Sequence, residues 1–132
     1  MSDSKNKTVP AVGIDIIEIS RIKETVKRWG TRFLERIYTK GELEYCRSRP
    51  PQLAARFASK EAMMKALGTG RYGVNWKDIE VVRPRGRAPN IILHGRANEV
   101  ARRLGIKHIA VSISHSREYA VATVHVEIES HI

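Results

Sequence analysis

The chain has 132 residues, and its 24 Lys and Arg against 14 Asp and Glu give a formal net charge of +10. This length is typical of one domain that buries a core of its own. Hydrophobic residues make up 42% of the chain and charged residues 29%, which excludes a disordered, collagen-like or membrane-embedded class. So basic a protein is expected to meet an anionic partner, which could be nucleic acid, a membrane surface, a polyphosphate or an acidic protein.

The N-terminus and the single cysteine indicate the compartment. Residues 1–9 are polar and lack the apolar segment of a signal peptide, so we expect a flexible leader there and one domain over residues 10–132. Cys46 alone cannot form an internal disulfide, which favours a reducing compartment, and we expect the cytoplasm. Since no apolar run approaches the roughly 18 residues of a spanning helix, we expect no membrane segment.

Helices are expected to dominate the first half of the chain. Residues 11–18 are rich in β-branched side chains, which favours a buried strand. Ser20 then caps a helix that Gly30 ends, and Thr39 begins a short helix with the spacing of a capping box. The longest helix is expected over residues 52–67, entered through two prolines.

Strands are expected to dominate the second half. Residues 79–81 and 91–93 are two short apolar segments on either side of a turn, which indicates a hairpin. A helix over 96–104 follows, and then two strands over 108–114 and 119–128. We therefore expect an α+β fold: a single domain with a mainly antiparallel sheet packed against one long and several short helices.

Asp15 interrupts the first apolar strand. Because side chains alternate along a strand, Gly13, Asp15 and Ile17 share one face, and Gly13 leaves space beside the carboxylate. A buried carboxylate needs a cation or several hydrogen-bond donors. Taken alone, such a residue more often caps a loop or lies at a frayed edge than ligates a metal.

Charged residues also interrupt the apolar stripe of the long helix. Lys60 lies in the middle of that stripe, Glu61 and Lys65 lie on its edge, and Arg56 precedes Lys60 by one turn. A charged pair of this spacing is usually a solvated surface contact. An acid ringed by cations also suits a metal-bound polyphosphate, because the acid holds a hard divalent ion and the cations offset the phosphate charge.

Two further segments leave alternatives open. Ser112 and Ser114 share one strand face and His115 ends the strand, which suits either a ligand at close approach or an ordinary solvated face. The basic turn over 83–87 is either a solvated turn or a phosphate-binding patch. A nucleic-acid-binding module is the alternative function, although aromatic and basic residues are not interleaved on a strand face as such modules require. A non-enzymatic scaffold would leave the charged interruptions without a reason.

Three segments, taken in order, resemble the signature blocks of the 4′-phosphopantetheinyl transferases. They are VGIDIIE at 12–18, FASKEAMMKA at 57–66 and SISHSREYA at 112–120. The short, single-domain length is similar to the holo-acyl-carrier-protein synthase branch of that family. The resemblance implies a transferase of fatty acid biosynthesis that moves the phosphopantetheine arm of coenzyme A to a serine of apo acyl carrier protein. It also implies Mg²⁺ dependence and release of adenosine 3′,5′-bisphosphate.

The resemblance assigns roles to single residues. Two acids are expected to ligate Mg²⁺: Asp15 and Glu61. Four basic residues are expected to contact coenzyme A and its phosphates: Arg56, Lys60, Lys65 and His115. We further expect Glu61, directly or through a water, to take the proton of the attacking serine while Lys65 neutralises a phosphate oxygen. The residues of the adenine pocket, the preferred carrier protein, and acceptance of acyl-CoA or Mn²⁺ stay open.

The resemblance also explains the charge of the chain. Acyl carrier proteins of this pathway are acidic helical bundles, so they suit a partner of charge +10. Four basic residues of the first helix are expected to contact the carrier: Arg21, Lys23, Lys27 and Arg28. Related enzymes are homotrimers with active sites shared between adjacent subunits, so we expect a homotrimer. We expect neither nucleic acid nor membrane as a partner.

Overall fold

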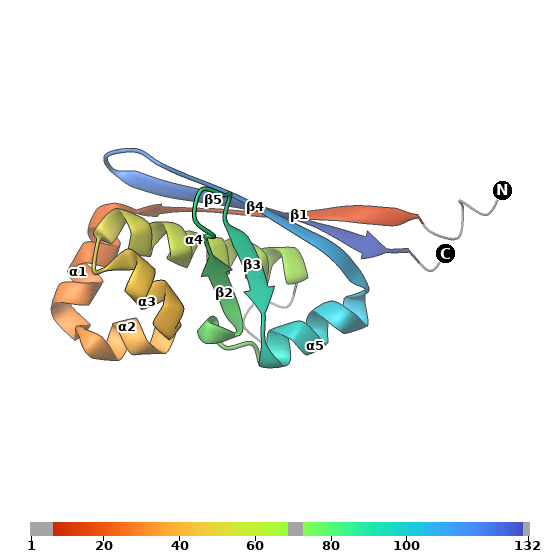
Figure 1. The fold of residues 1–132 in the computed structure, drawn as a ribbon, viewed down its shortest axis with the longest axis horizontal. Coiled ribbons are helices and arrows are strands. Elements are labelled where there is room, and N and C mark those ends of the chain that lie inside the picture. The colour runs from red at the N-terminus through yellow and green to blue at the C-terminus, as the bar shows by residue number, and fades with distance from the viewer. Residues whose placement is uncertain (1–6, 69–72, 131–132) are drawn as a thin grey trace.

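The computed structural model describes residues 7–68 and 73–130. The first half holds β1 (Thr8–Glu18), α1 (Ile19–Trp29), α2 (Thr31–Ile37), α3 (Lys40–Cys46) and α4 (Pro50–Leu67). The second half holds the 3₁₀ helix η2 (Trp76–Asp78), β2 (Ile79–Val82), β3 (Asn90–Leu93), α5 (Gly95–Leu104), β4 (Ile106–His115) and β5 (Tyr119–Glu129). The expected α+β fold with an antiparallel sheet is confirmed (Figure 1).

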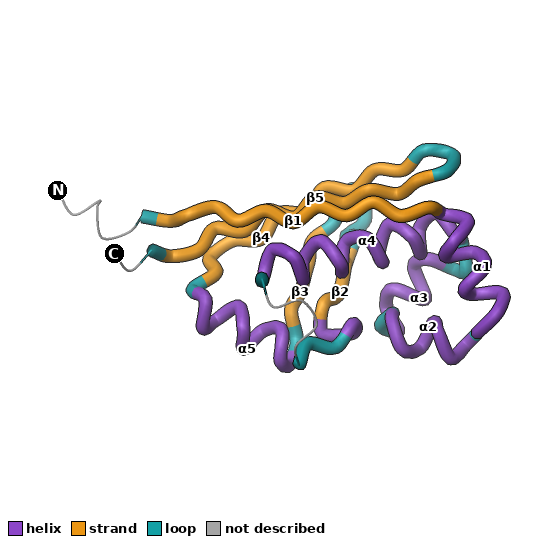
Figure 2. The backbone as a smooth tube through the Cα atoms, turned by 180° about the vertical axis from the view of Figure 1, so that it is seen from behind, coloured by secondary structure: helices purple, strands orange, loops and turns teal. Residues whose placement is uncertain are grey.

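The three long strands form one antiparallel sheet in the order β1-β5-β4. Asp15 of β1 is opposite Ala122 of β5, and Ser112 of β4 is opposite Thr123. β2 and β3 form a separate two-stranded sheet. Helix α4 lies along one face of the long sheet, with α1, α2 and α3 gathered near its N-terminal end and α5 near its C-terminal end (Figures 1 and 2). The long helix is therefore the centre about which the other elements are arranged.

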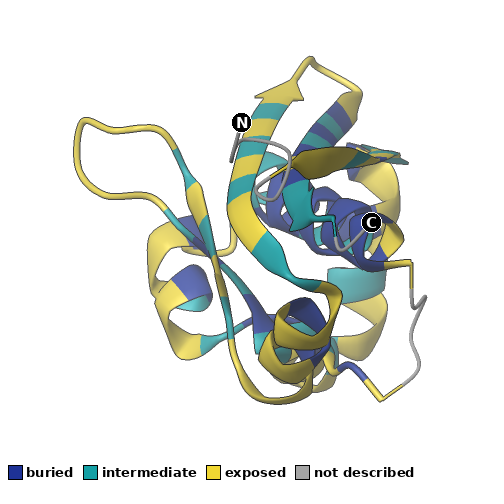
Figure 3. Ribbon diagram, turned by 90° about the vertical axis from the view of Figure 1, so that its right-hand side faces the viewer, coloured by how far each residue is buried: buried dark blue, intermediate teal, exposed yellow. Residues whose placement is uncertain are grey.

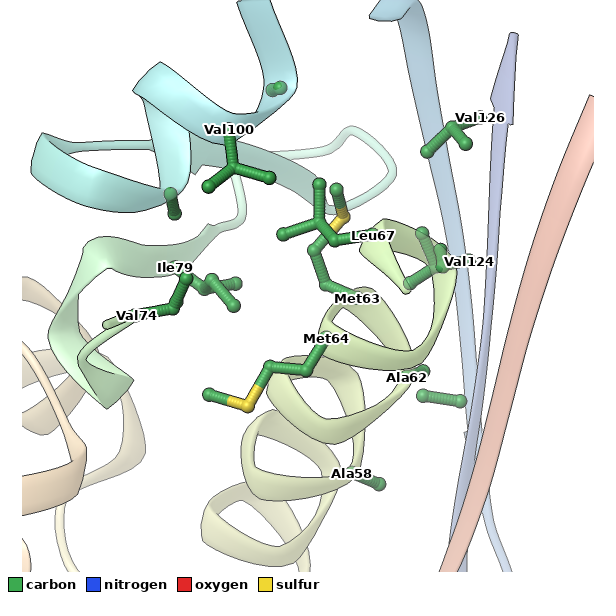
Figure 4. Packing of buried hydrophobic residues seen from close by; sticks show 14 residues of the cluster. Ala58, Ala62, Met63, Met64, Leu67, Val74, Ile79, Val100, Val124 and Val126 are labelled. Atoms are coloured by element: carbon green, nitrogen blue, oxygen red, sulfur yellow. The ribbon is translucent and has the colours of Figure 1, made fainter. Parts of the chain in front are cut away.

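The hydrophobic core lies on both sides of α4. Ala58 and Ala62 face the sheet, while Met63 and Met64 reach toward Ile79 of the small sheet and its neighbours (Figure 4). α4 is buried over most of its length (Figure 3), because it is covered on more than one side. Small side chains on the sheet side let the strand backbone approach the helix closely.

The outer face of β1 differs from the expected buried strand. Val12, Ile14 and Ile16 are each more than half exposed, while Gly13 is buried against α4. The alternation of side chains was predicted correctly, but α4 covers only one face of the sheet. β1 therefore presents a row of large apolar side chains to the surroundings of this chain.

Several expected boundaries need correction. Thr8 and Val9 were assigned to a flexible leader over 1–9, yet they pair with Glu129 and Ile128 as part of β1. Residues 1–6 of that leader lie outside the described residues. The long helix begins at Pro50, because both prolines occupy its first turn, where no N–H donor is needed.

Two features near α1 were not predicted correctly. α1 has Glu18 as its N-cap without a side-chain cap hydrogen bond, so Ser20 does not cap it. Gly30 ends α1 with a positive φ as expected, but α2 begins directly after it, and no helix was predicted there. Across residues 7–68 and 73–130, no helix is both long and apolar enough to span a bilayer.

Candidate active site

Asp15 and Glu61 line the same pocket, although they lie on different elements. Asp15 is on the face of β1 that packs against α4, and Glu61 is on α4. The pocket has a volume of about 300 Å³, and α1 contributes Arg21 to its wall. We name it the carboxylate pocket; its other lining residues are Ile16, Ile17, Ile22, Thr25, Phe33 and Phe57. The structure thus brings together the two acids that the sequence analysis assigned to a metal.

Gly13 explains why β1 and α4 lie so close. A Cβ atom at Gly13 would be 1.8 Å from the carbonyl oxygen of Ala62, far inside van der Waals contact. Only glycine therefore allows this approach. Gly13 is two residues from Asp15 on the same strand face, and Ala62 directly follows Glu61, so this contact sets the distance between the two carboxylates.

Lys65 lies beside Asp15. Its Nζ donates hydrogen bonds to Asp15 Oδ1 at 3.1 Å and to the carbonyl oxygen of Ile14 at 2.9 Å. The side chain of Lys65 is 55% exposed and that of Asp15 is 18% exposed. The ammonium group can therefore turn toward an incoming anion without leaving a buried cation unpaired.

The donor set fits a hard divalent cation that is shared with a substrate. Within residues 7–68 and 73–130 no group of three or more His, Cys, Asp or Glu gathers as a candidate metal centre. Mg²⁺ does not need such a group, because it is usually bound by one or two carboxylates together with waters and phosphate oxygens. Asp15 and Glu61 supply the two carboxylates in a pocket that is open to solvent.

A second pocket contains the other predicted coenzyme contacts. Arg56 of α4 and His115 of β4 line a pocket of about 310 Å³, which we name the coenzyme pocket. Tyr45, Gln52, Ala55, Arg83, Ala88, Pro89, Val111, Ser112 and Ile113 complete its wall. The guanidinium of Arg56 lies 4.3 Å from the centre of the Tyr45 ring. Arg56 is buried, and its Nε has no hydrogen-bond partner among the described residues.

The carboxylate and coenzyme pockets lie at opposite edges of the long sheet. Asp15 is on β1 and His115 is on β4, and β5 lies between these two strands. Strands separated by one other strand are about 10 Å apart. The two pockets share no lining residue. One chain therefore brings its predicted site residues together in two groups.

Lys60 was predicted to contact phosphate, and the structure contradicts this. Its side chain is 0% exposed, and Nζ forms an ion pair with Glu42 Oε1 at 2.8 Å. The same Nζ donates to the backbone carbonyl oxygens of Trp76 and Ile79. An ammonium group has three donors, and all three are used inside the protein. Burial lowers the pKa of Lys60, while the carboxylate of Glu42 opposes that shift.

The basic residues of α1 are spread over different surfaces. Arg21 lines the carboxylate pocket, whereas Lys23 lines another pocket beside the turn between β4 and β5. Lys27 and Arg28 lie in the last turn of α1. Arg28 lies over the ring of Trp29, which is 53% exposed.

Sequence reasoning missed a groove between α1 and α2. Its walls are formed by Thr25, Trp29, Arg32, Phe33 and Arg36. Thr25 and Phe33 also line the carboxylate pocket, so the groove adjoins that pocket. The sequence signal for the groove is the alternation of aromatic and basic residues over 29–36. This pattern indicates a groove only once a helix has been assigned to these residues.

Comparisons with known proteins identify the family of this chain. The model of the 4′-phosphopantetheinyl transferase superfamily matches residues 11–124. A holo-[acyl-carrier-protein] synthase of Moorella thermoacetica is 52% identical over 118 residues, which cover 87% of this chain and 91% of that protein. One of Koribacter versatilis is 50% identical over 119 residues, which cover 87% of this chain and 95% of that protein.

Solved structures show the same fold. The crystal structure of Helicobacter pylori holo-[acyl-carrier-protein] synthase in complex with coenzyme A has a TM-score of 0.80 and 36% identity, covering 87% of this chain and 98% of that one. That of the Bacillus anthracis synthase in complex with CoA (3′,5′-ADP) has a TM-score of 0.75 and 34% identity, covering 92% and 99%. With the family match over most of its length, the chain belongs to the 4′-phosphopantetheinyl transferase superfamily.

Proposed function

We propose that the chain is a holo-[acyl-carrier-protein] synthase that transfers the 4′-phosphopantetheine arm of coenzyme A to a serine of apo acyl carrier protein in a Mg²⁺-dependent reaction. The observation that carries this proposal is the meeting of Asp15 and Glu61 in one pocket, with Lys65 beside them, in a member of this superfamily. The relatives named above support the choice of substrates.

Asp15 and Glu61 would hold the metal ion. When bound, Mg²⁺ supplies positive charge to the oxygens of the coenzyme diphosphate and fixes its orientation. The carboxylates themselves come from a strand and a helix that pack against each other, so their separation is fixed before substrate binds. Such preorganisation accounts for much of the catalysis in phosphoryl-type transfer.

Glu61 and Lys65 assist the formation and cleavage of the bonds to phosphorus. The serine oxygen forms a bond to the β-phosphorus, and the bond between that phosphorus and the bridging oxygen breaks. The serine proton passes to Glu61, directly or through a water, and adenosine 3′,5′-bisphosphate leaves. Lys65, half exposed and paired with Asp15, offsets the negative charge that develops on the leaving phosphate.

A direct assay tests this function. Purified protein is incubated with apo acyl carrier protein, coenzyme A and Mg²⁺, and the phosphopantetheine adduct is sought by mass spectrometry. EDTA should abolish the adduct, and Glu61→Gln should abolish it without loss of the fold. Lys107→Ala is the matched control, because Lys107 pairs with Glu129 on the surface, away from both pockets. Full activity of Glu61→Gln would contradict the assignment.

We also propose that the active protein is a homotrimer in which each site is completed by two subunits. Arg56 and His115 line a different pocket from Asp15 and Glu61, and a second chain would bring the two kinds of pocket together around one coenzyme. The exposed Val12, Ile14 and Ile16 on β1 offer an apolar surface for that contact.

Mixed subunits test the shared site. Asp15→Ala and Arg56→Ala are each expected to be inactive alone. Dissociated and reassembled together, they should regain measurable transfer, because some interfaces combine the intact carboxylate pocket of one chain with the intact coenzyme pocket of another. A mixture that exchanges subunits but stays inactive would show that each chain holds a complete site. Sedimentation would establish the number of subunits.

The carrier protein is proposed to contact α1 and the groove beside it. Arg32 and Arg36 line that groove, Lys27 and Arg28 lie next to it, and Trp29 gives it an apolar floor. An amphipathic acidic helix matches such a surface in both charge and polarity. Because the groove adjoins the carboxylate pocket, a carrier bound there would present its serine to Glu61.

A further inference from the structure

A fully buried ion pair joins α3 and α4, which line the coenzyme pocket, to β2, which leads directly into Arg83 of the pocket wall, and the proposed transfer does not use it. The side chains of Lys60 on α4 and Glu42 on α3 are both 0% exposed, with 2.8 Å between Nζ and Oε1. Glu42 Oε2 accepts a 2.8 Å hydrogen bond from the backbone N–H of Val81 on β2. The pair therefore connects α3, α4 and β2 directly.

The two helices joined by this pair carry the Arg56–Tyr45 stack. Arg56 is one turn before Lys60 on α4, and Tyr45 is one turn after Glu42 on α3. The guanidinium of Arg56 lies 4.3 Å from the Tyr45 ring centre, and its Nε is buried without a hydrogen-bond partner among the described residues. The position of α3 relative to α4 thus decides where this donor points.

The third element, β2, leads directly into a residue of the pocket wall. Val81 is two residues before Arg83, which lines the coenzyme pocket together with Pro89, the residue before β3. Lys60 also donates to the carbonyl oxygen of Ile79, so β2 is held at two points along its backbone. A shift of β2 would move Arg83 and Pro89 relative to Arg56.

We propose that Lys60 and Glu42 are positioning residues that set the width of the coenzyme pocket and thereby the affinity for coenzyme A. The inference rests on the proposed function only for the identity of the ligand. Hydrogen bonds from two charged groups to fixed backbone atoms define a geometry that apolar side chains of the same volume do not define. A buried ion pair adds little to stability over such apolar packing. A role in positioning would explain why an ion pair is buried here.

The variant Glu42→Gln tests this role with little change of shape. Its amide has one acceptor oxygen in place of two, so the bonds to Lys60 and to Val81 N–H cannot both be kept. Calorimetric titration of the full chain with coenzyme A should show an affinity about ten-fold weaker or more. The KM for carrier protein should stay near the wild-type value. Lys107→Ala, which removes an exposed ion pair, is the control that should change neither quantity.

A double-mutant cycle separates positioning from stability. If Glu42 places Arg83, then Arg83→Ala should weaken coenzyme binding strongly in the wild type and only slightly in Glu42→Gln. If Glu42→Gln does not fold, Thr39→Ala replaces it, because this change removes the hydroxyl that accepts a hydrogen bond from the backbone N–H of Glu42 and caps α3. That milder variant should weaken coenzyme A binding in the same direction, and wild-type affinity in it would overturn the proposal.

The outcomes distinguish this inference from the proposed function. Equal coenzyme A affinity in wild type and Glu42→Gln, or strictly additive effects in the cycle, would overturn the positioning role. A wild-type protein that binds coenzyme A but modifies no carrier protein would contradict the transferase and leave the positioning role standing. A wild-type protein that does not bind coenzyme A would overturn both.

Discussion

Replacing Gly13 by alanine should separate the two proposed metal ligands. A Cβ atom there would lie 1.8 Å from Ala62 O, 2.8 Å from Ala62 C and 2.9 Å from Ala66 N. These are backbone atoms, so no side-chain rotation relieves the contact. Restoring ordinary contact with Ala62 O, at about 3.4 Å, moves β1 and α4 apart by about 1.6 Å along that line. Asp15 moves with β1, and Glu61 moves with α4.

Both activity and stability should fall. A misplacement of about 1 Å in a catalytic constellation costs about 100-fold in rate, so transfer by Gly13→Ala should drop by at least that factor. Overpacking of a core contact costs about 1–3 kcal/mol of unfolding free energy. The smaller unfolded-state entropy of alanine, worth about 0.4–1 kcal/mol, does not offset this.

The adduct assay and urea unfolding measure the two effects. Gly41→Ala on α3 is the matched control, because its Cβ would meet side-chain atoms alone, Glu80 Oε2 at 3.1 Å and Thr39 Oγ1 at 4.0 Å. Ala62→Gly should not rescue Gly13→Ala, since the obstructing oxygen belongs to the backbone. A Gly13→Ala protein with wild-type rate and stability would refute the view that this contact sets the carboxylate separation.

Three further outcomes are expected. The KM for carrier protein should rise several-fold as salt is raised, and K27E/R28E should flatten that response; an unchanged salt dependence would contradict docking at α1. Buried Cys46, whose pKa burial raises to about 11, should resist alkylation at pH 8 until urea unfolds the chain, so rapid labelling of the native protein would contradict its burial. Burial also raises the pKa of Tyr38, and the unfolded thiol ionises near its ordinary pKa of 9.0. The contribution of the buried thiol to the free energy of unfolding is therefore fully present below pH 9 and should be lost as the pH rises toward 11. In urea unfolding, the stability of Cys46→Ala should fall less steeply with pH across that range than the stability of the wild type. An identical pH dependence in the two proteins would contradict the assignment of this loss to the Cys46 thiol.

Local chemistry made much of the fold predictable. Thr39 and Glu42 form the capping box that their spacing predicts, and Gly30 ends α1 in a conformation that suits glycine. The alternation along β1 correctly placed Gly13 and Asp15 on the face that packs against α4. In each case the signal lies within a few residues of the element that it specifies.

Contacts between distant segments were not predictable in the same way. The sequence indicated that Lys60 needs an anion, but Glu42 and a phosphate were equally suitable until α3 was placed against α4. Trp29 follows Ile22 and Val26 at helical spacing, yet it is 53% exposed and lines the groove between α1 and α2. The position of a surface residue depends on how the following element packs, which no local pattern records.

The basic side chains lie in three different environments. Lys60 is neutralised within the core by Glu42, so it contributes nothing to the surface that meets an anionic substrate. Lys65 and Arg21 lie beside the acids at one sheet edge, while Arg56 and Arg83 line the pocket at the other. A diphosphate ester held at either edge alone would meet only half of these groups. In the proposed shared site, both groups would contact one diphosphate ester where the coenzyme pocket of one chain faces the carboxylate pocket of the next.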